Sequence, residues 1–416
     1  MSRPLAILGA RLLDPESGYD GPGAVLVQDG VIAEIARKPH LDSTPEEAET
    51  LDARGRALAP GLIDLRGRRD PDVLSRQAAE GGVTSVVFHS YPSASAGTPE
   101  RIAAIARAPR PGARVLPAAP ATLGMEGERL AEIGLLREAG AVLITDGDRA
   151  IGDSRVLRRV LRYAAGFSVP VAHRPIDVHL SRGAVAGEGE FAARLGLPGV
   201  PDVAERIGLE RDVAIAEATG APVHLDALST AVGVEALASA KRRGAPVTGA
   251  VALAHLVFNE VEMGGLDTRF RLDPPLRPEA DRTALVQALA DGVLDVVVSG
   301  HLPVPPEAKN LPYVEAEPGG AMLHALLPGL LNLHHADGLD LLDLLRPVTL
   351  NPARLLGLPS GRIAKGAPAD LVLFDPSAPV VMPALGSPFD GRRLQGRVLA
   401  TWVGGRPVYE VAAAAR

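Results

Sequence analysis

The chain has 416 residues, 46% of them hydrophobic and 22% charged, with a formal net charge of −7 and no cysteine. This composition predicts a folded protein with a sizeable core, and it excludes disulfides, thiolate metal sites and cysteine nucleophiles. The acidic balance argues against nucleic-acid binding, and no apolar run reaches the roughly 20 residues of a membrane span. Because the N-terminus also lacks a signal-peptide pattern, we expect a cytoplasmic protein that binds neither nucleic acid nor membrane.

Both ends of the chain have the pattern of short strands joined by turns. In residues 1–58, two apolar runs flank Asp29-Gly30, a pair typical of a tight hairpin turn. Residues 359–416 show the same pattern, with apolar runs that flank Gly404-Gly405. Because neither end can bury a whole sheet alone, we predict one small β-sandwich domain formed by residues 1–58 together with 359–416.

Residues 59–358 have a different pattern, in which short apolar runs alternate with segments of helical periodicity. Eight such runs begin near residues 61, 83, 113, 141, 169, 221, 245 and 294. Eight buried runs that alternate with helices predict a closed (β/α)8 TIM barrel of the α/β class. Helices predicted for its outer ring include 154–165, 204–219, 232–243 and 282–291. Chemistry in this fold lies at the carboxyl ends of the strands, so the residues after each run are the functional candidates.

Several motifs stand at these strand ends in a specific order. They are Ala59-Pro-Gly-Leu-Ile-Asp-Leu, Thr145-Asp146-Gly147, Asp273-Pro-Pro-Leu-Arg277, Ser299-Gly-His301-Leu-Pro and Thr349-Leu-Asn-Pro-Ala353. Together they resemble the amidohydrolase superfamily and, within it, most closely the dihydroorotases. The resemblance implies a barrel whose metal centre activates a bridging water to attack a cyclic amide, as in the interconversion of dihydroorotate and N-carbamoyl-aspartate.

Most of the family's metal and proton-transfer positions are lost in this chain. The resemblance places the histidine pair after strand one on Arg66 and Arg68, and arginine stays protonated and has no lone pair to give. The histidine after strand six falls on Ala227, and the aspartate after strand eight falls on Gly300. Four of six functional positions therefore lack their residue. We expect no zinc, no other cofactor and no catalytic residue.

Two ligand positions are retained, Asp146 after strand four and His173 after strand five. Two protein ligands fall short of the three that catalytic zinc usually has. We expect these remnants to form a buried ion network with Arg66 or Arg68. The alternatives are a mononuclear metal site on the remnants, or an anion bound by the two arginines.

Three further family positions at the barrel mouth are retained, namely His255, Arg277 and His301. We interpret the two histidines as packing groups rather than catalytic acids. Asp226 lies one residue before Ala227, so strand alternation predicts that its side chain points to the other face. Glycine-rich residues 183–199 and residues 303–320 are expected to be long loops.

The substrate-binding positions depart from the family as well. Its carboxylate-binding arginine falls on Asp70, which reverses the charge, and two of its asparagines fall near Tyr91 and on Asp273. Losses in metal binding, proton transfer and substrate recognition point the same way. They indicate a protein that has kept the fold of the family and lost the residues of its reaction.

Two classes of function follow. The first is a non-catalytic dihydroorotase homologue, a structural subunit that the resemblance pairs with the catalytic chain of aspartate carbamoyltransferase in pyrimidine biosynthesis. Such a protein would be an oligomer with a protein partner. The second is an active cyclic-amide hydrolase with a reduced or atypical metal site. A third possibility is a free-standing sensor of carboxylate metabolites that uses the arginine pair.

Overall fold

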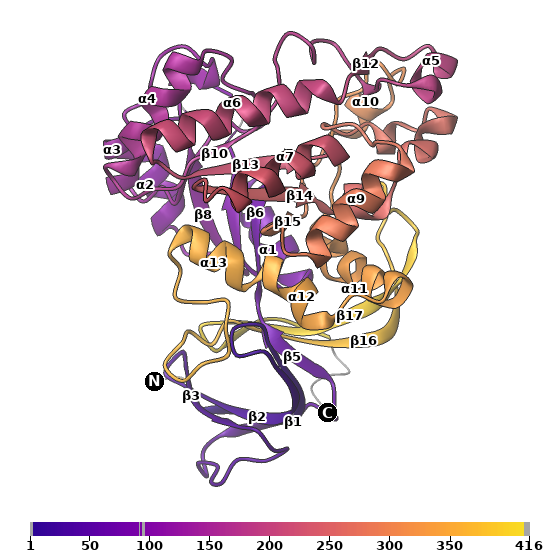
Figure 1. Cartoon of the computed structure of the whole chain (residues 1–416). Helices are drawn as coiled ribbons and strands as arrows, with labels where there is room; N and C mark the ends of the chain where they lie inside the picture. The colour runs from indigo at the N-terminus through magenta and orange to yellow at the C-terminus, as the bar shows by residue number, and fades with distance from the viewer. Residues whose placement is uncertain (1–2, 91, 94–95, 412–416) are drawn as a thin grey trace.

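The computed structural model describes residues 3–90, 92–93 and 96–411. Figure 1 shows a barrel surrounded by helices and, beneath it, a smaller β domain where both chain ends lie. The chain leaves the β domain through β5 (Ala57–Pro60) and returns to it in β16 (Leu371–Val381), and these two strands pair antiparallel. The predicted α/β class, with a barrel and a β domain built from both termini, is confirmed.

The β domain is one continuous sheet. In spatial order its strands are β18 (Arg406–Glu410), β17 (Arg393–Val403), β16, β5, β1 (Leu5–Asp14), β2 (Tyr19–Gln28) and β3 (Val31–Ala36), with β4 (Glu49–Asp52) paired to β1. Asp29 and Gly30 form the turn between β2 and β3, and both have positive φ, as a tight two-residue hairpin turn requires. Apolar side chains from both chain ends, including Ile7, Leu58 and Trp402, share one core. The predicted sandwich is therefore a single sheet that curls around this core.

In the part of the chain that the structure describes, eight strands form the barrel, at the positions of the eight predicted runs. They are β6 (Leu62–Gly67), β7 (Val83–Phe88), β8 (Arg114–Ala119), β9 (Leu143–Ile144), β10 (Ala172–His173), β13 (Val223–Leu228), β14 (Val247–Ala252) and β15 (Val296–Val298). Hydrogen bonds join them into two parallel four-stranded halves. Parallel bridges from Ile144 to Val171 and from Gly67 to His301 connect the halves on both sides, so the barrel is closed. The strand ends that carry the candidate residues therefore surround one mouth.

Helices cover the outside of the barrel (Figure 1). They are α1 (Pro71–Glu80), α2 (Pro99–Arg107), α3 (Ile133–Glu138), α4 (Ser154–Ala165), α6 (Val203–Thr219), α7 (Ala231–Arg242), α9 (Glu279–Ala290), α11 (Leu326–Asp337), α12 (Leu341–Leu345) and α13 (Leu350–Leu356). The predicted helix 154–165 coincides with α4, which buries Leu157 and Val160 on one face and begins where the Asp153 carboxylate accepts a hydrogen bond from the N–H of Arg155. The other three predicted helices correspond to α6, α7 and α9.

The two segments expected as long loops contain regular structure. Residues 183–199 include β11 (Ala186–Gly187), α5 (Glu190–Leu195) and the start of β12 (Gly199–Val200), and residues 303–320 include α10 (Pro306–Lys309). Short helices elsewhere are α8 (Leu253–Val257) and the 3-10 helices η1 (Leu123–Met125), η2 (Glu260–Gly265), η3 (Thr268–Phe270), η4 (Leu323–Ala325) and η5 (Arg346–Val348). The parallel pair β11–β12 ties the two ends of the glycine-rich segment together.

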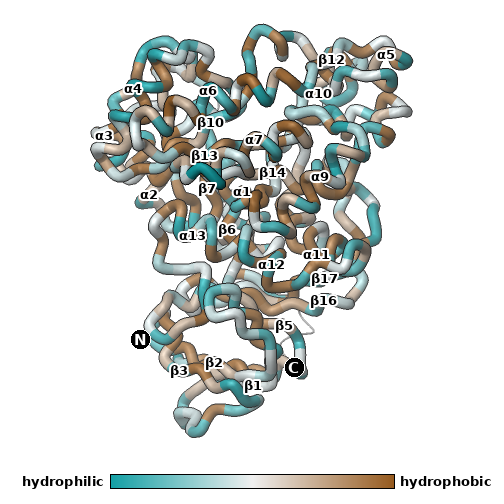
Figure 2. Tube along the Cα trace, in the orientation of Figure 1, coloured by the Kyte–Doolittle hydropathy of each residue, from teal (hydrophilic) through white to brown (hydrophobic). Residues whose placement is uncertain are grey.

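Hydrophobic residues concentrate along the barrel strands and the inner sides of the helices, and hydrophilic residues lie mainly in the outer loops (Figure 2). One large apolar cluster runs through the barrel and its helices, and a separate cluster fills the β domain. Within the described ranges, no helix is both long enough and apolar enough to cross a bilayer.

The passage from β5 into β6 leaves no room for a side chain at Gly61. A Cβ built there would lie 2.1 Å from Thr84 Cγ2, and Thr84 is fully buried on β7. We therefore expect Gly61→Ala to lower the free energy of unfolding by about 1–3 kcal/mol through overpacking, measured by urea denaturation. The control is Gly265→Ala, where a Cβ would meet no atom within 4 Å. Equal unfolding midpoints for Gly61→Ala and the wild type would contradict the packing argument.

Candidate functional site

Arg66 lies in the barrel mouth, near the end of β6, between two aspartates. Its guanidinium forms an ion pair with Asp148, in the segment that follows β9, and a second ion pair of 2.8 Å with Asp226 of β13. Arg68, just beyond β6, lies 3.0 Å from the other carboxylate oxygen of Asp148. The mouth therefore holds a buried ion network in which Asp148 bridges the two arginines.

Asp226 points into the mouth, contrary to the expectation from strand alternation. The pairing of β13 with β14 shifts its register between Leu225 and Leu228, and Ala227 between them has a left-handed backbone with φ of 58°. A bulge of this kind inserts a residue and resets the alternation of faces. The expected orientation is wrong because the strand is irregular at this point.

Charges in the network stabilise one another. Burial by itself would raise the pKa of Asp148, but Arg66, Arg68 and Arg174 hold that pKa well below its usual range. Burial would likewise lower the pKa of Arg66, whereas Asp226 and Asp148 hold it above its ordinary value. The Arg66 and Arg68 side chains are only 13% and 11% exposed, so water screens these interactions weakly. Asp148 and Arg66 are therefore both ionised at neutral pH.

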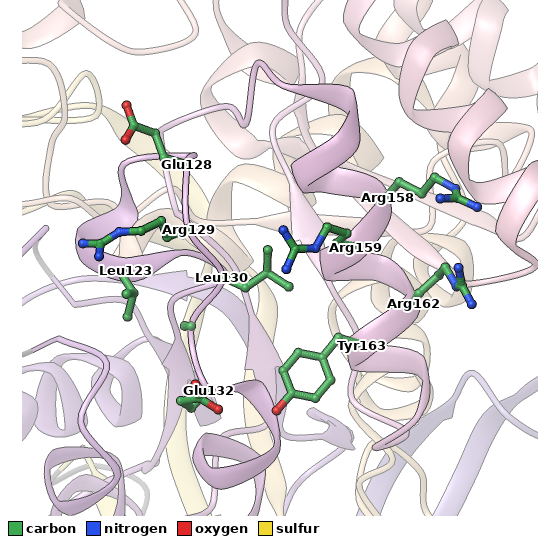
Figure 3. Close-up of a pocket in the computed structure, with 10 residues that line it drawn as sticks. Leu123, Glu128, Arg129, Leu130, Glu132, Arg158, Arg159, Arg162 and Tyr163 are labelled. Carbon is green, nitrogen blue, oxygen red and sulfur yellow. The ribbon is translucent and has the colours of Figure 1, made fainter.

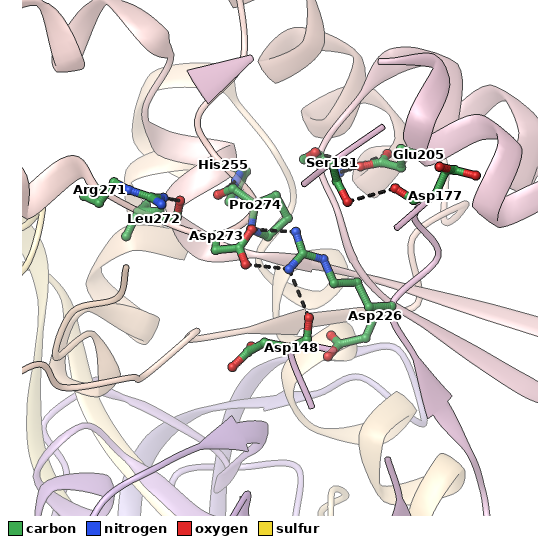
Figure 4. Close-up of polar contacts among 12 residues, drawn as sticks. Asp148, Asp177, Ser181, Glu205, Asp226, His255, Arg271, Leu272, Asp273 and Pro274 are labelled. Atoms are coloured by element: carbon green, nitrogen blue, oxygen red, sulfur yellow. Dashed lines mark hydrogen bonds and ion pairs between the residues drawn. The ribbon is translucent and has the colours of Figure 1, made fainter. Parts of the chain in front are cut away.

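A second arginine–aspartate pair lies beside the first. Arg174, which follows β10, donates hydrogen bonds to both carboxylate oxygens of Asp273 at 2.5 and 2.6 Å and to the backbone carbonyl of Asp148 at 3.2 Å. Asp148, Asp226 and Asp273 thus lie close together at the mouth (Figure 4). Burial would raise the pKa of Asp273, but Arg174 lowers it. Asp273 replaces the family's asparagine, and its negative charge is therefore balanced by Arg174.

Asp146 does not pair with Arg66 or Arg68, so the predicted partner of the arginines is wrong. Its carboxylate accepts hydrogen bonds from the backbone N–H groups of Ala121 and Thr122 at 2.8 and 3.0 Å, and from the Thr122 hydroxyl at 2.5 Å. Asp146 thus fixes the segment that follows β8. Asp148, two residues further along the same loop, takes the place that was predicted for Asp146.

His173 is also engaged elsewhere, so its predicted pairing with the arginines is wrong as well. The N–H of Ile151 donates to Nε2 at 2.8 Å, which places the ring proton on Nδ1, and Nδ1 donates to Asp212 at 2.5 Å. Asp212 is fully buried and lies 2.8 Å from Arg211. Because Nε2 already accepts a hydrogen bond, His173 has no lone pair left for a metal.

The family implies a metal centre, and the donor set at this mouth does not fit one. Asp146 and His173 are occupied by the contacts above, and Ala227 and Gly300 offer no ligand atom. No three His, Asp or Glu side chains in the described part of the chain group closely enough to hold a metal ion. The guanidinium of Arg66 would in addition repel a dication. Asp148, Asp226 and Asp273 are instead paired with Arg66, Arg68 and Arg174.

His255 and His301 are buried, neutral rings at the mouth. Burial lowers the pKa of His255 to about 4 and that of His301 to about 3. His301 Nδ1 accepts hydrogen bonds from the backbone N–H groups of Met322 and Leu323 at 3.1 and 3.3 Å, and His255 Nε2 lies 3.1 Å from the carbonyl oxygen of Pro274. These backbone contacts fit packing roles.

Arg277 and Gly300 lie at the edge of the site rather than in the ion network. Arg277 is buried and donates hydrogen bonds to the Val200 carbonyl at 2.9 Å and to Ser229 Oγ at 3.3 Å. Gly300 has a left-handed backbone with φ of 68°, and a Cβ there would lie 3.4 Å from Met322 Cε. A side chain at position 300 would therefore be strained.

Asp70, which replaces the family's carboxylate-binding arginine, has a structural role. Its side chain caps α1 by accepting hydrogen bonds from the N–H groups of Asp72 and Val73 at 3.0 and 3.2 Å. It does not join the ion network among the described residues. Tyr91 lies outside the described residues.

The space that remains at the bottom of the mouth is small. A cavity of about 80 Å³ is lined by residues that include Arg66, Asp148, His255 and Gly300. Pockets that bind drug-sized molecules are commonly about 300–1,000 Å³. With the Arg66 side chain in place, the deep site is too small for a substrate. A wider cleft of about 950 Å³ lies further out, between Arg149, Arg182 and Arg271.

A separate groove lies on the outer wall of the barrel. It has a volume of about 750 Å³, and Figure 3 shows it between α4, which carries Arg159, Arg162 and Tyr163, and the segment that carries Arg129 and Leu130. None of these three arginines forms an ion pair with another described residue. The groove is a basic surface on an acidic protein, and it shares no lining residue with the cavity or the cleft at the mouth.

Comparison with known proteins identifies the family. Residues 169–408 match the model of the amidohydrolase family, and residues 55–232 match the dihydro-orotase-like model. The chain is 37% identical to a dihydroorotase of Anaeromyxobacter dehalogenans over 431 residues, covering 99% of each chain, and 38% identical to a dihydroorotase-like protein of Pseudomonas aeruginosa over 423 residues, covering 98% of this chain and 99% of that one. The chain therefore belongs to the amidohydrolase family. Within that family it is a dihydroorotase-like protein.

Solved structures show the same fold. An L-hydantoinase from Arthrobacter aurescens superposes with a TM-score of 0.85 at 21% identity, covering 98% of this chain and 96% of that one. A dihydropyrimidinase from Brevibacillus agri gives 0.83 at 21% identity, covering 98% and 95%. At this identity the likeness concerns the fold, and it confirms a TIM-type barrel with a β domain formed by both termini.

Sequence reasoning missed three members of the ion network, namely Asp148, Asp226 and Arg174. A usable signal was present, because two buried arginines require carboxylates close by. The sequence Asp146-Gly-Asp148 offers a second acid in the same loop, and Arg174 directly follows the retained His173. The inward turn of Asp226 has no such signal, since it depends on the bulge at Ala227.

Removal of the bridging carboxylate tests the network. We expect Asp148→Asn to lower the free energy of unfolding at pH 7 by about 3 kcal/mol, because Arg66 and Arg68 are left without their shared counter-charge. The folded-state pKa of Asp148 lies below its unfolded value, so its contribution is present above pH 4 and is lost as the pH falls below it. The stability gap between the variant and the wild type should therefore shrink in acid.

Denaturant unfolding at several pH values measures this gap. Glu210→Gln, which removes an exposed ion pair with Arg206, is the control and should have little effect at any pH. A gap that stays constant from pH 7 to pH 3 would show that Asp148 acts by its shape and not by its charge.

Proposed function

We propose that this chain is a catalytically inactive dihydroorotase-like protein. In this proposal it serves as a structural subunit and assembles with the catalytic chain of aspartate carbamoyltransferase in pyrimidine biosynthesis. The observation that carries the proposal is the Arg66 guanidinium, which lies between Asp148 and Asp226 at the place where the family's chemistry calls for a metal ligand.

The lost chemistry supports inactivity. Hydrolysis of a cyclic amide in this family relies on metal-bound water and on a carboxylate that moves the proton. Here Arg66 and Arg68 replace two ligands, His173 uses its accepting nitrogen on Ile151, and Gly300 replaces the carboxylate. These losses fall on three different strand ends, those of β6, β10 and β15. A single compensating contact therefore does not repair the site.

The retained scaffold supports a structural role. The barrel is closed, the composite β domain is complete, and the fold matches the solved hydantoinase and dihydropyrimidinase structures over nearly the whole chain. A protein that keeps its fold while its site is filled by ion pairs is expected to be used through its surface. Aspartate carbamoyltransferase is the partner that the family resemblance implies, and no residue of this chain by itself identifies it.

The second candidate is an active cyclic-amide hydrolase that interconverts dihydroorotate and N-carbamoyl-aspartate at an atypical site. The observation that favours it is the 37% identity, over 99% of both chains, to a relative named dihydroorotase. This candidate requires either a metal site built on other donors or a reaction that uses the arginines. The two candidates predict different metal contents and different activities.

Turnover separates the two candidates. Protein purified without added zinc should contain far less than one zinc per chain and should convert neither dihydroorotate nor N-carbamoyl-aspartate, because the mouth lacks metal ligands. Metal analysis by mass spectrometry and a product assay in both directions measure this, with an active dihydroorotase as the positive control. Stoichiometric zinc together with chelator-sensitive turnover would establish the hydrolase instead.

Restoring the first ligand pair should not restore activity. The double variant Arg66→His/Arg68→His still lacks ligand atoms at Ala227 and Gly300, and it leaves Asp148 and Asp226 without their counter-charges. We expect no hydrolysis of dihydroorotate, with or without added zinc, and a lower melting temperature. Circular dichroism checks that the variant is folded. Zinc-dependent hydrolysis by this variant would contradict the interpretation of the other two positions.

Assembly tests the proposed partner. Mixed with the aspartate carbamoyltransferase catalytic chain encoded in the same genome, this protein should elute as a larger complex in size-exclusion chromatography with light scattering. The catalytic chain from an unrelated bacterium is the control and should elute separately. Separate elution of the cognate pair at micromolar concentrations would refute the partnership and leave the inactivity to be judged by turnover alone.

A further inference from the structure

The outer cleft of the barrel mouth has an excess of positive charge that the ion network does not use. This cleft, of about 950 Å³, is lined by Arg149, Arg182 and Arg271. Of the carboxylates on its walls, Asp148 is paired with Arg66 and Arg68, and Asp273 is paired with Arg174. The remaining acid in the lining, Glu126, is exposed to solvent.

Two of the three arginines of the cleft contact backbone carbonyls, and none of the three forms an ion pair with a described residue. Arg149 donates a hydrogen bond to the Met125 carbonyl at 3.3 Å, and Arg271 donates one to the Leu272 carbonyl at 3.0 Å. Within the described ranges, no carboxylate lies within ion-pair distance of Arg149, Arg182 or Arg271. The ion pairs deep in the mouth therefore do not include these three arginines.

Arg271 is the exceptional member of the three. It is half-buried, and its Nε is fully buried with no hydrogen-bond acceptor among the described residues. Burial lowers the pKa of this guanidinium, and the charge of Asp273, which is paired with Arg174, offsets that effect only in part. A buried donor without an acceptor destabilises the fold, and does so more when it is charged, so it calls for an explanation.

A second cation increases that cost. Lys309 donates hydrogen bonds to the backbone carbonyls of Thr268 and Arg271 at 2.8 and 3.2 Å. Burial and then the charge of Arg271 lower the pKa of Lys309 to about 8. The nearby Asp267 is paired with Arg269 at 2.6 Å. Position 271 thus combines a shortage of acceptors with an excess of positive charge, which an anion would relieve.

The walls of the cleft indicate what kind of anion fits. Apolar side chains of Ile176, Val178, Val200 and Val314 line it beside the arginines. An inorganic ion would leave these walls in contact with water, whereas an organic molecule covers them. A carboxylate matches the planar guanidinium fork and brings a carbon skeleton for the walls.

We propose that the outer cleft binds a small organic carboxylate, whose oxygens accept hydrogen bonds from Arg271 and whose charge is shared by Arg149 and Arg182. This site goes beyond the proposed function, because it uses none of the vestigial metal positions and requires no catalysis. It also differs from an anion site on Arg66 and Arg68, whose charges Asp148 and Asp226 already match.

Binding of simple carboxylates to the full chain tests the proposal. Acetate, succinate, glutarate and benzoate are titrated at matched ionic strength, with inorganic phosphate and sodium chloride as comparison anions, and the melting temperature and the heat of binding are measured. We expect a saturable rise in melting temperature with at least one carboxylate and none with chloride. No saturable shift with any carboxylate, or an equal shift with every anion, would overturn the proposal.

Two arginine variants locate the site. Arg271→Met keeps the aliphatic part of the side chain but removes the guanidinium, and it should weaken carboxylate binding about tenfold or more, as expected for the loss of a charged hydrogen bond. Arg159→Met, in the basic groove of Figure 3, is the matched control and should bind like the wild type. Weakening by Arg159→Met and not by Arg271→Met would place the binding site in that groove and overturn the assignment.

The stability of the unliganded variant distinguishes a binding role from a structural one. Without ligand, Arg271→Met should melt at the same temperature as the wild type or higher, because it removes a half-buried cation that forms no ion pair with a described residue. A clear fall in melting temperature would show that Arg271 stabilises the fold itself, and this would overturn the proposal. Because these samples contain neither dihydroorotate nor N-carbamoyl-aspartate, binding is measured separately from turnover.

Discussion

The ion network of Arg66, Asp148 and Asp226 is the interaction on which the rest of the mouth depends. A guanidinium that water barely reaches is stable only with carboxylates in direct contact, and this requirement fixes where three strand ends lie. Arg66 belongs to β6, Asp148 follows β9, and Asp226 belongs to β13. Bonds across the mouth thus link parts of the barrel that are not neighbours in its sheets.

In metal-dependent members of a barrel family, a bound ion can itself tie strand ends together. Here side chains of both signs perform that task. The pair Arg174–Asp273 extends the network toward β10 and the segment that follows η3. A consequence is that ion pairs hold the strand ends together without a bound metal, so the absence of a metal ion does not loosen the fold.

The fold was largely predictable from the sequence because its signals are local and repeated. Eight apolar runs, the Asp29-Gly30 turn and the amphipathic pattern of residues 154–165 each specify an element without reference to distant residues. The family motifs then placed the strand ends in order. The departures from the family at residues 66, 68, 227 and 300 were equally visible, because they depend on position alone.

The pairing within the site was not predictable in the same way. Position along the chain favoured Asp146 and His173 as partners of the arginines, but a buried side chain bonds to the nearest group of suitable geometry. Thr122 takes Asp146, and Asp212 takes His173, from segments far away in sequence. Asp226 reaches Arg66 only because Ala227 adopts a left-handed backbone. Such bulges arise from tertiary contacts and leave little trace in local sequence.

The composite β domain has a consequence for how the chain is made. β5 pairs with β1 on one side and with β16 on the other, and β16 to β18 follow the whole barrel in sequence. While the protein leaves the ribosome, β1 to β5 emerge first and can pair among themselves, but one edge of β5 stays open until the last strands arrive. An open edge of this kind is a template for pairing with other chains. The nascent protein therefore carries an aggregation-prone edge for most of its synthesis, and its final strands serve to close it.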